Sequence, residues 1–363
     1  MRIVIDARES GTSTGRYIDK LVEYLHELKP AHKIIVLTKK QRLNYIRSIA
    51  PRFEVVESNF KEFTFAEQTG FLKQLRSLKA DLVHFGMTQQ PVLYFGKKVT
   101  TVHDLTTVRF RNPSKNLLVY WFKQQVYKWM IRRVAHSSKQ LITPSQYVKD
   151  DLAKFASINS RKITVTYEAA DKISQTPEPI NQLLNTKFIM YVGRPTPHKN
   201  LERLVEAFRI LKNQNPELVL ALAGKTDRNY KKVSKLVSSK SLNDSVVFTG
   251  FISEGQLRWM YENTAAYVFP SLSEGFGLPG LEAMAHNAPV VSSNATCLPE
   301  IYGEAAHYFD PEDVQDIAVK IATVVNSPKV RENLIKNGQD QVKKYSWAKM
   351  AEQTLDIYQE LLS

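Results

Sequence analysis

The chain has 363 residues, 43% of them hydrophobic, so it is long enough for two folded domains and too apolar for a disordered protein. Its single cysteine, Cys297, excludes disulfides within the chain and favours a reducing, cytosolic setting. The sequence begins directly with a strand-like run and has no apolar run of the roughly 20 residues that span a membrane, so we expect neither a signal peptide nor a transmembrane helix.

The formal net charge of +14 comes entirely from the first half of the chain. Residues 1–180 hold 30 Lys and Arg against 16 Asp and Glu, whereas residues 181–363 hold 20 of each. Such an excess is either a solvated basic surface or a surface that meets an anionic partner, such as a membrane, a lipid phosphate or a nucleic acid.

Strand-like and helix-like runs alternate through the first half. A strand at Arg2–Asp6 is followed by a loop rich in Gly, Ser and Thr and by a helix from Gly15 to Leu28. Ser145 is placed to cap a later helix. The other expected elements are strands at Lys33–Leu37, Phe53–Glu57, Asp81–His84, Val99–His103, Gln140–Thr143 and Ile163–Tyr167, and a long helix at Asn116–Ala135.

The alternation breaks at residues 173–186, where Pro177 and Pro179 indicate a linker, and then resumes. The expected strands of the second series are Phe188–Val192, Leu218–Ala223, Val246–Thr249, Ala265–Phe269 and Pro289–Ser292. Its expected helices are Leu201–Leu211, Tyr230–Val237, Glu254–Glu262, Gly280–His286, Glu312–Val325, Lys329–Lys344 and Trp347–Leu361. Two such series predict an α/β protein with two doubly wound parallel-sheet domains and a ligand site in the cleft between them, at the carboxyl ends of the strands.

Two carboxylates bracket a glycine-rich loop between a buried strand and a helix. Glu274 and Glu282 are separated by seven residues, three of which are glycines. A strand, a glycine turn and a helix N-terminus together offer backbone N–H groups to an anion, usually a phosphate. The run Gly275–Gly280 also matches the Gly-x-Gly-x-x-Gly pattern of dinucleotide sites. It lies late in its domain, however, and the next strand ends in Ser292-Ser293-Asn294, without an acid for a ribose, so NAD is disfavoured.

A second loop, from Gly193 to Asn200, also follows a strand and precedes a helix. It carries Arg194 and Lys199, with no acid between them. A forked donor and a point charge suit a diphosphate, and the alternative is a surface loop with incidental cations. Because the acidic loop accompanies it, we favour a role in binding.

His103 ends a strand at the expected ligand side of the first sheet. A lone histidine is more often structural, but the adjoining Asp104, Thr106 and Thr107 favour a polar site. The loop that ends at Gly15 opens the first helix and could hold a phosphate or an acceptor hydroxyl.

Several other kinds of site lack their motif. The chain has no Asp-x-Asp pair and its eight histidines show no metal spacing, so a metal-dependent transfer site is not supported. It has no Gly-x-Ser-x-Gly run, and its one cysteine has no readable partner, so acyl transfer is not expected. Gly224-Lys225-Thr226 resembles the end of a P-loop, but Val219 stands where the first glycine is needed.

The helix expected at Asn116–Ala135 is rich in both aromatic and basic residues. One interpretation is a core helix with a basic outer face. The alternative is a helix on a membrane surface, where Trp and Tyr sit at the headgroups and Lys and Arg meet anionic lipid.

Together these motifs resemble those of the retaining glycosyltransferases of family 4, which have the GT-B fold, over essentially the whole chain. The most specific part is Glu274 and Glu282 with seven residues between them. The other matching runs are Gly15-Arg16-Tyr17, Val102-His103-Asp104-Leu105, Thr143-Pro144-Ser145, Gly193-Arg194, His198-Lys199-Asn200-Leu201, Ala288-Pro289-Val290-Val291, Leu298-Pro299-Glu300 and Tyr345-Ser346-Trp347. The resemblance implies two Rossmann-like domains facing across a cleft. Residues 1–172 and 347–363 would form the acceptor-side domain, 173–186 the linker and 187–346 the nucleotide-sugar-binding domain.

The resemblance also implies a role for each site residue. Glu274 and His103 are expected to contact the donor sugar at the reacting centre. Arg194 and Lys199 are expected to bind the diphosphate and stabilise the leaving group, which completes the catalytic set. The residues expected to bind the nucleotide sugar are Gly15, Gly193, Gly224, Gly275, Phe276, Gly277, Leu278 and Glu282, the last through the ribose.

The implied reaction needs no metal and no cofactor besides the nucleotide-sugar substrate, because cations and helix N-termini neutralise the departing diphosphate. No carboxylate is clearly placed as a nucleophile, so we expect transfer on one face of the sugar, with the leaving-group oxygen assisting the acceptor. Two departures from the family pattern bear on the contacts of the first domain. The loop Gly11–Gly15 is rich in Ser and Thr, and Ala170 precedes Asp171 where a glycine is common.

The resemblance is greatest to mannosyltransferase-type members, so GDP-mannose is the expected donor and a UDP-hexose the alternative. The expected acceptor is a glycan or a lipid-linked hydroxyl in polysaccharide or glycolipid biosynthesis. We expect a cytoplasmic protein, with peripheral contact to an anionic membrane through its basic first half and no nucleic-acid partner. The alternatives are a sugar-nucleotide-binding protein without transfer activity and a sugar-nucleotide epimerase of the same fold.

Overall fold

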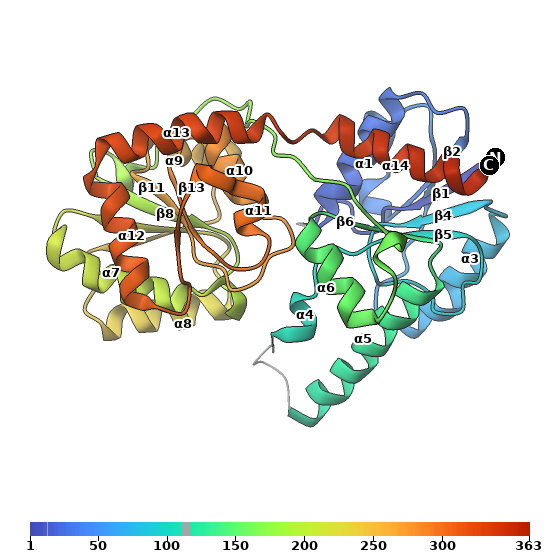
Figure 1. The fold of residues 1–363 in the computed structure, drawn as a ribbon, viewed down its shortest axis with the longest axis horizontal. Helices are drawn as coiled ribbons and strands as arrows, with labels where there is room; N and C mark the ends of the chain where they lie inside the picture. The colour runs from blue at the N-terminus through green and yellow to red at the C-terminus, as the bar shows by residue number, and fades with distance from the viewer. Residues whose placement is uncertain (13, 111–116) are drawn as a thin grey trace. The chain divides into compact units, whose positions relative to one another are not determined.

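The computed structural model describes residues 1–12, 14–110 and 117–363, which form two compact units. The first unit holds Met1–Arg109, residues 117–168 and Ser346–Ser363, and the second holds Ala169–Tyr345. Each unit is a parallel sheet with helices on both faces (Figure 1). The last helix of the chain therefore belongs to the first unit.

The first sheet has the strand order β3-β2-β1-β4-β5-β6-β7, and neighbouring strands run parallel. The order reverses between β1 and β4, so the loops after these strands diverge at the carboxyl edge, where ligands bind in such sheets. The strands are β1 Arg2–Asp6, β2 Lys33–Thr38, β3 Glu54–Glu57, β4 Leu82–Phe85, β5 Lys98–Thr101, β6 Gln140–Thr143 and β7 Ile163–Val165. The helices are α1 Gly15–Glu27, α2 Leu43–Ile49, α3 Leu72–Ser77, α4 Thr106–Arg109, α5 Leu117–Ser137, α6 Gln146–Ala156 and α14 Trp347–Leu362.

Helix α14 is joined to the core of the first unit by buried polar side chains. The Tyr358 hydroxyl lies 2.5 Å from Nδ1 of His84 on β4. Nε2 of His84 lies 2.9 Å from Oγ1 of Thr101, which also lies 3.0 Å from the Tyr17 hydroxyl. Burial, with a smaller contribution from the charge of His103, lowers the pKa of His84 to about 3, so the ring is neutral.

The second sheet has the order β10-β9-β8-β11-β12-β13, again parallel, with its reversal between β8 and β11. In Figure 1, α7, α8 and α12 cover one face of this sheet, and α9, α10, α11 and α13 cover the other. The strands are β8 Phe188–Val192, β9 Val219–Ala223, β10 Val246–Gly250, β11 Ala266–Phe269, β12 Val290–Ser293 and β13 Ala306–Phe309. The helices are α7 Leu201–Gln214, α8 Arg228–Ser239, α9 Glu254–Asn263, α10 Leu278–Ala285, α11 Leu298–Tyr302, α12 Val314–Asn326 and α13 Pro328–Val342.

The predicted fold class, two doubly wound parallel-sheet domains of Rossmann-like topology, is confirmed. The expected cap of α6 is also present, because Oγ of Ser145 accepts the Val148 N–H at 3.3 Å. The start predicted for the long helix, Asn116, lies outside the described residues, and from Leu117 the helix runs to Ser137. None of the helices in the described ranges is long and apolar enough to cross a bilayer.

The observed elements differ from the predicted ones in several places. The strand β13 was not predicted, because Ala306 and His307 give it little β-strand character and it is only four residues long. Helix α10 begins at Leu278, two residues before the predicted Gly280, with Pro279 in its first turn. Strand β5 ends at Thr101, so His103 lies in the loop beyond it.

Candidate active site

The site residues of the second unit lie where its strand order reverses. The loop after β8 and the loop after β11 flank this point and are bonded to each other. The His198 carbonyl accepts the Leu272 N–H at 2.7 Å, and Nδ2 of the buried Asn200 donates to the Pro270 carbonyl at 3.1 Å. The two loops singled out by sequence are therefore neighbours at the carboxyl edge of the sheet.

One ion pair joins the two loops at two of the residues predicted from sequence. Nζ of Lys199 lies 2.5 Å from Oε1 of Glu274, and the side chains are only 20% and 14% exposed. The backbone of Glu274 is fixed as well, since its N–H donates to Oγ1 of Thr296 at 3.1 Å and its carbonyl accepts from Sγ of Cys297 at 3.4 Å. The site therefore holds a cation and a carboxylate in contact at a fixed position.

The glycine loop enters α10 through Gly277, which has a φ of 99° and is the N-cap of the helix. The hydroxyl of the buried Tyr302 donates to the Gly277 carbonyl at 2.5 Å. A Cβ at Gly280 would lie 2.3 Å from that hydroxyl, so glycine is needed for Tyr302 to pack beneath the first turn of α10. The turn thereby directs the positive end of the α10 dipole to the carboxyl edge, as an anionic ligand requires.

Glu282 lies in the second turn of α10 and is 9% exposed. Its carbonyl accepts from Nδ1 of His286 at 2.8 Å, and Nε2 of His286 accepts the Ile173 N–H at 3.0 Å. Phe276 is buried, and its ring packs edge-on against Tyr345 at a centroid distance of 5.5 Å. The part of Phe276 that a ligand could use is therefore its backbone, as is also the case for Gly275. Leu278 is half-buried and is the first residue of α10.

Glycines end three neighbouring strands, at Gly193 after β8, Gly224 after β9 and Gly250 on β10. The Gly224 N–H donates to the Gly250 carbonyl at 2.9 Å. The Tyr230 hydroxyl lies 3.0 Å from the Gly193 carbonyl oxygen and 2.8 Å from that of Ala223, so these two acceptors share its one proton. A Cβ at Gly224 would lie 2.4 Å from the Gly193 oxygen. This row leaves a strip of backbone without side chains beside the Lys199–Glu274 pair.

Arg194 is not part of that pair. Its side chain is 76% exposed, and an Nη atom lies 3.7 Å from Oδ2 of Asp227. Asp227 also caps α8 by accepting the N–H groups of Asn229 and Tyr230. An ion pair this long and this exposed is weak, so the guanidinium can turn to an anionic ligand.

His103 lies in the first unit, beside the point where that sheet reverses. Its Nε2 lies 3.0 Å from the Gly86 carbonyl after β4, and its Nδ1 lies 3.3 Å from Oε1 of Glu168. The Tyr17 ring meets it edge-on at 5.0 Å. Burial acts to lower the pKa of His103, but the hydrogen bond and charge of Glu168 outweigh this effect and raise it.

Gly15, the other predicted residue of this unit, opens α1 close to the same edge. A Cβ there would lie 1.8 Å from the Glu9 carbonyl oxygen, so only glycine allows the loop after β1 to close on α1. Its N–H donates to Oγ1 of Thr12 at 3.0 Å. The contacts that hold Gly15 are thus intramolecular, and residue 13 of this loop lies outside the described part of the chain.

A cavity of about 320 Å³ opens at this edge of the first unit, next to His103. Its lining combines carboxylates, a lysine and two aromatic rings, those of Phe63 and Tyr127, whose centroids are 5.9 Å apart. Burial and the nearby charge of Glu62 raise the pKa of Glu9. The lining residues are Glu9, Thr14, Lys61, Glu62, Phe63, Met87, Thr88, Gln89, His103, Asp104, Thr107 and Tyr127.

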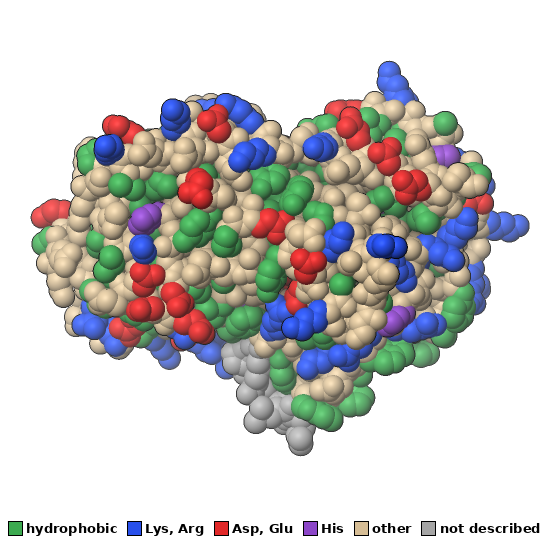
Figure 2. Space-filling view, viewed as in Figure 1, with side chains coloured by type: hydrophobic (Ala, Val, Ile, Leu, Met, Phe, Trp, Pro, Cys, Tyr) green, Lys and Arg blue, Asp and Glu red, His purple; other side chains and the backbone are tan. Residues whose placement is uncertain are grey.

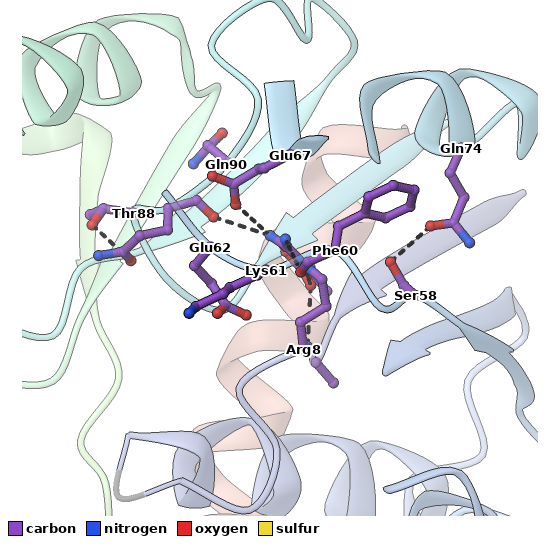
Figure 3. Close-up of polar contacts among 12 residues, drawn as sticks. Arg8, Ser58, Phe60, Lys61, Glu62, Glu67, Gln74, Thr88 and Gln90 are labelled. Atoms are coloured by element: carbon purple, nitrogen blue, oxygen red, sulfur yellow. Dashed lines mark hydrogen bonds and ion pairs between the residues drawn. The ribbon is translucent and has the colours of Figure 1, made fainter. Parts of the chain in front are cut away.

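A buried arginine holds the loops that form this cavity (Figure 3). Arg8 is 1% exposed, and its guanidinium donates to both carboxylate oxygens of Asp6, at 2.9 and 2.8 Å, and to Oε1 of Glu67 at 3.0 Å. It also donates to the carbonyls of Phe60 at 3.2 Å and Gln89 at 3.4 Å. Arg8 therefore connects the end of β1 to the loops after β3 and β4.

Sequence reasoning missed the residues that support the site. Tyr302, Thr296 and Tyr230 hold the glycine loops, and Arg8 holds the cavity. The one available signal was Asp6-Ala7-Arg8, a charged pair directly after a buried strand. Among the described residues, no group of three His, Cys, Asp or Glu side chains is arranged to hold a metal ion.

Comparison with known proteins assigns both halves of the chain. Residues 14–172 match the family described as Glycosyltransferase Family 4, and residues 174–341 match the family described as Glycosyl transferases group 1.

Two relatives by sequence carry names that specify a reaction. The chain is 28% identical to the O-antigen chain mannosyltransferase B of Escherichia coli over 274 residues, 73% of this chain and 71% of that protein. It is 26% identical to the O-antigen chain mannosyltransferase RfbU of Salmonella typhimurium over 329 residues, 88% of this chain and 89% of that protein.

The fold is also similar to solved structures. Anabaena HepE, solved in complex with UDP-glucose, superposes with a TM-score of 0.76 and 14% identity, covering 99% of this chain and all of that one. At this identity the similarity shows a common fold.

Proposed function

Because the chain belongs to the glycosyltransferases of family 4, which have the GT-B fold, we propose that it transfers a hexose, with mannose favoured, from a nucleotide diphosphate sugar to a hydroxyl acceptor. The proposed transfer retains the configuration at the anomeric carbon and needs neither a metal ion nor a further cofactor. The observation that carries the proposal is the Lys199–Glu274 pair at the reversal point of the second sheet.

In the proposed reaction the bond from the anomeric carbon to the diphosphate oxygen breaks while the acceptor oxygen bonds to the same face of the sugar. The departing oxygen takes the acceptor proton. Lys199, Arg194 and the positive end of α10 neutralise the charge that builds on the diphosphate, the task a metal would otherwise perform. Lys199 also orients Glu274, which binds the sugar hydroxyls.

The remaining roles follow from position. The backbone N–H groups of Gly275–Leu278 bind phosphate and sugar at the start of α10, and Glu282 binds the ribose. Gly193 and Gly224 let the nucleotide approach the sheet edge. Both positions require glycine, because a Cβ at Gly193 would lie 2.9 Å from the Tyr191 hydroxyl and one at Gly224 would lie 2.4 Å from the Gly193 carbonyl oxygen. We assign His103 to the transferred sugar and Gly15 to the phosphate or acceptor side.

Two comparisons bear on the donor. The names of the Escherichia coli and Salmonella typhimurium relatives specify mannosyl transfer in O-antigen chains, which favours GDP-mannose and a role in polysaccharide biosynthesis. The UDP-glucose in the HepE structure makes a UDP-hexose the alternative.

The cavity of the first unit is the proposed acceptor site. Carboxylates such as Glu9 and Glu62 can accept hydrogen bonds from sugar hydroxyls, and the rings of Phe63 and Tyr127 can pack against a sugar face. The acceptor class is a glycan, free or lipid-linked. The basic first half supports a location at the cytoplasmic face of an anionic membrane.

A thermal-shift series with GDP, UDP, GDP-mannose and UDP-glucose tests the donor. Ligand that binds only the folded chain at about a hundred times its Kd stabilises it by about 2.7 kcal/mol, so the preferred base gives the larger rise in Tm. If none of the four compounds raises the Tm, the proposed site is contradicted. A larger rise with UDP than with GDP would replace GDP-mannose by a UDP-hexose as the proposed donor.

Product analysis then distinguishes transfer from the two alternatives. When the chain is given donor and an acceptor glycan, we expect sugar to appear on the acceptor. Glu274→Gln should abolish this transfer, whereas Glu332→Gln, at an exposed position, should not. Binding without any turnover would identify a sugar-nucleotide-binding protein. Conversion of the donor sugar without acceptor would identify an epimerase.

A further inference from the structure

Helix α5 is apolar on two opposite faces. Its inner face, with Ile131 and Ala135, packs into the hydrophobic core beneath β6 and α6. Phe122, Val126 and Trp129 follow one another at spacings of four and three residues, so they form a stripe on a single face. They are 65%, 46% and 55% exposed, and so this second stripe faces away from the core.

Two loops of the first unit add exposed apolar side chains beside this stripe. Phe63, 64% exposed, contacts the Tyr127 ring of α5 at 5.9 Å, and Phe95, 71% exposed, lies 5.9 Å from the guanidinium of Arg133 on α5. The segments that carry Phe63 and Phe95 are also bonded to each other, because the side-chain amide oxygen of Gln68 accepts the Val92 N–H at 2.9 Å. We call this surface the aromatic patch, and it comprises Phe63, Phe65, Leu93, Phe95, Trp121, Phe122, Val126 and Trp129.

The aromatic patch holds eight of the fourteen strongly exposed large hydrophobic side chains in the described part of the chain. An apolar area gathered in this way usually marks an interaction surface. In Figure 2, hydrophobic side chains lie next to Lys and Arg along the edge of the first unit that α5 forms.

The charge around the aromatic patch indicates which partner it fits. The sequence of α5, Leu117–Ser137, contains Lys123, Lys128, Arg132 and Arg133 and no Asp or Glu. In a symmetric pair of chains these cations would face one another, which opposes self-association. Exposed Trp and Phe flanked by cations instead match the interface of an anionic bilayer, where the rings sit at headgroup depth and the cations meet lipid phosphates.

We propose that the aromatic patch docks the first unit onto an anionic lipid bilayer, with α5 lying along its surface. Phe63 belongs both to the aromatic patch and to the lining of the proposed acceptor cavity, where its ring contacts Tyr127 of α5. A docked chain therefore places that cavity next to the lipid surface, so the acceptor is a lipid-linked glycan. This last step rests on the proposed function, whereas the docking surface does not.

Flotation with lipid vesicles tests the docking, with neither donor nor acceptor present. Wild type should float with vesicles of phosphatidylcholine and phosphatidylglycerol and stay in solution with phosphatidylcholine alone. Phe122→Glu combined with Trp129→Glu should lower binding at least about tenfold, since two carboxylates would enter the interface. Val319→Glu, at an apolar position that is 49% exposed on α12 of the second unit, is the control and should float like wild type.

Lys123→Gln combined with Lys128→Gln should weaken flotation several-fold without changing an aromatic ring, and raising the salt to about 1 M should do the same. Circular dichroism and the nucleotide thermal shift verify that each variant is folded. Equal flotation of wild type and the Phe122→Glu, Trp129→Glu variant would overturn the proposal. The proposal would also be overturned if wild type sedimented as a dimer, the Phe122→Glu, Trp129→Glu variant sedimented as a monomer, and neither bound vesicles.

The two proposals fail separately in these experiments. Flotation without any sugar transfer, to soluble or vesicle-borne acceptors, would leave the docking surface intact and overturn the proposed function. Transfer to a soluble glycan without flotation would support the proposed function and overturn the docking surface.

Discussion

Lys199 and Glu274 stabilise each other in a partly shielded pair, and in the proposed function each has a second task toward the donor. The sequence singles out both residues because each lies in a short, specific motif. Their contact could not be predicted, because it depends on how the fold brings the two loops together. The sequence could not show that Arg194 stays apart, paired with Asp227, because the two cations occupy the same short loop.

Replacing Lys199 by Met should lower kcat about 10²- to 10³-fold, because the diphosphate loses a charge that compensates it mainly in the transition state. The KM for the donor should change much less. Steady-state kinetics with saturating acceptor measures both, and Lys329→Met on α13 is the exposed control. An unchanged kcat with a raised KM would instead assign Lys199 to ground-state binding.

Arg8 is a residue whose importance is structural. Arg8→Met leaves the buried carboxylates of Asp6 and Glu67 without their cation, which should reduce the free energy of unfolding by about 3–5 kcal/mol. Denaturant unfolding measures the loss, and the exposed Arg47→Met should stay within about 0.5 kcal/mol of wild type. A small loss for Arg8→Met would mean that the loops of the cavity are held by other contacts.

At the level of elements, the sequence predicted most helices and strands from their periodicity, and the main errors are informative. The predicted start of α10 at Gly280 followed from treating its glycines as loop. In the structure those glycines serve the packing of Tyr302, which lies more than twenty residues further along the chain. Periodicity cannot report such a contact, because it describes only one element at a time.

Gly280→Ala tests this packing. The new methyl group would overlap the Tyr302 hydroxyl, so the first turn of α10 must shift and nucleotide affinity should fall at least about tenfold. Tyr302→Leu removes the overlapping atoms and should recover part of the affinity when combined with Gly280→Ala. Calorimetric titration of the four chains gives the coupling energy, and additive losses would contradict the assignment.

The contact between α14 and β4 predicts a pH dependence of folding. The pKa of His84 is about 3 in the folded chain and near 6.5 when unfolded, so the folded state binds fewer protons between these values. Stability should be unaffected by this group above pH 6.5 and fall by about 1.4 kcal/mol per pH unit below it. His103, whose pKa is raised, acts oppositely, and its contribution is lost only as the pH rises through its folded value.

His84→Asn should therefore have a flatter stability profile than wild type between pH 6.5 and about 5, by about 2 kcal/mol over the interval. Urea unfolding at each pH measures the two slopes. Because the comparison uses slopes, any constant loss from the substitution does not affect it. Equal slopes would show that the ring takes up a proton in the folded chain.

For the whole molecule, composition and alternation were enough to predict two parallel-sheet domains. They could not give the strand orders, which depend on pairings between distant segments, and they did not reveal the edge strand β13. The first unit is also discontinuous in sequence, since α14 packs on it through buried residues including Trp347, Met350 and Tyr358.

A chain that ends at Tyr345 should therefore lose the first unit selectively. Removing α14 exposes the apolar surface against which it packs and leaves the His84 ring without Tyr358. Hydrogen exchange should show loss of protection in β1, β4 and α1, while the second unit keeps its protection and its nucleotide thermal shift. Full protection of β1 and β4 in the shortened chain would contradict this.

The position of α14 also sets an order of events during synthesis. The ribosome makes almost all of the first unit before it begins the second, yet the helix that completes the first unit leaves the exit tunnel only after the whole second unit. The second unit can fold as soon as its own segment has emerged, so the half made first reaches its native state last. Until then the nascent first half exposes unfinished core as well as its aromatic surface, and chaperones would be needed most in this interval.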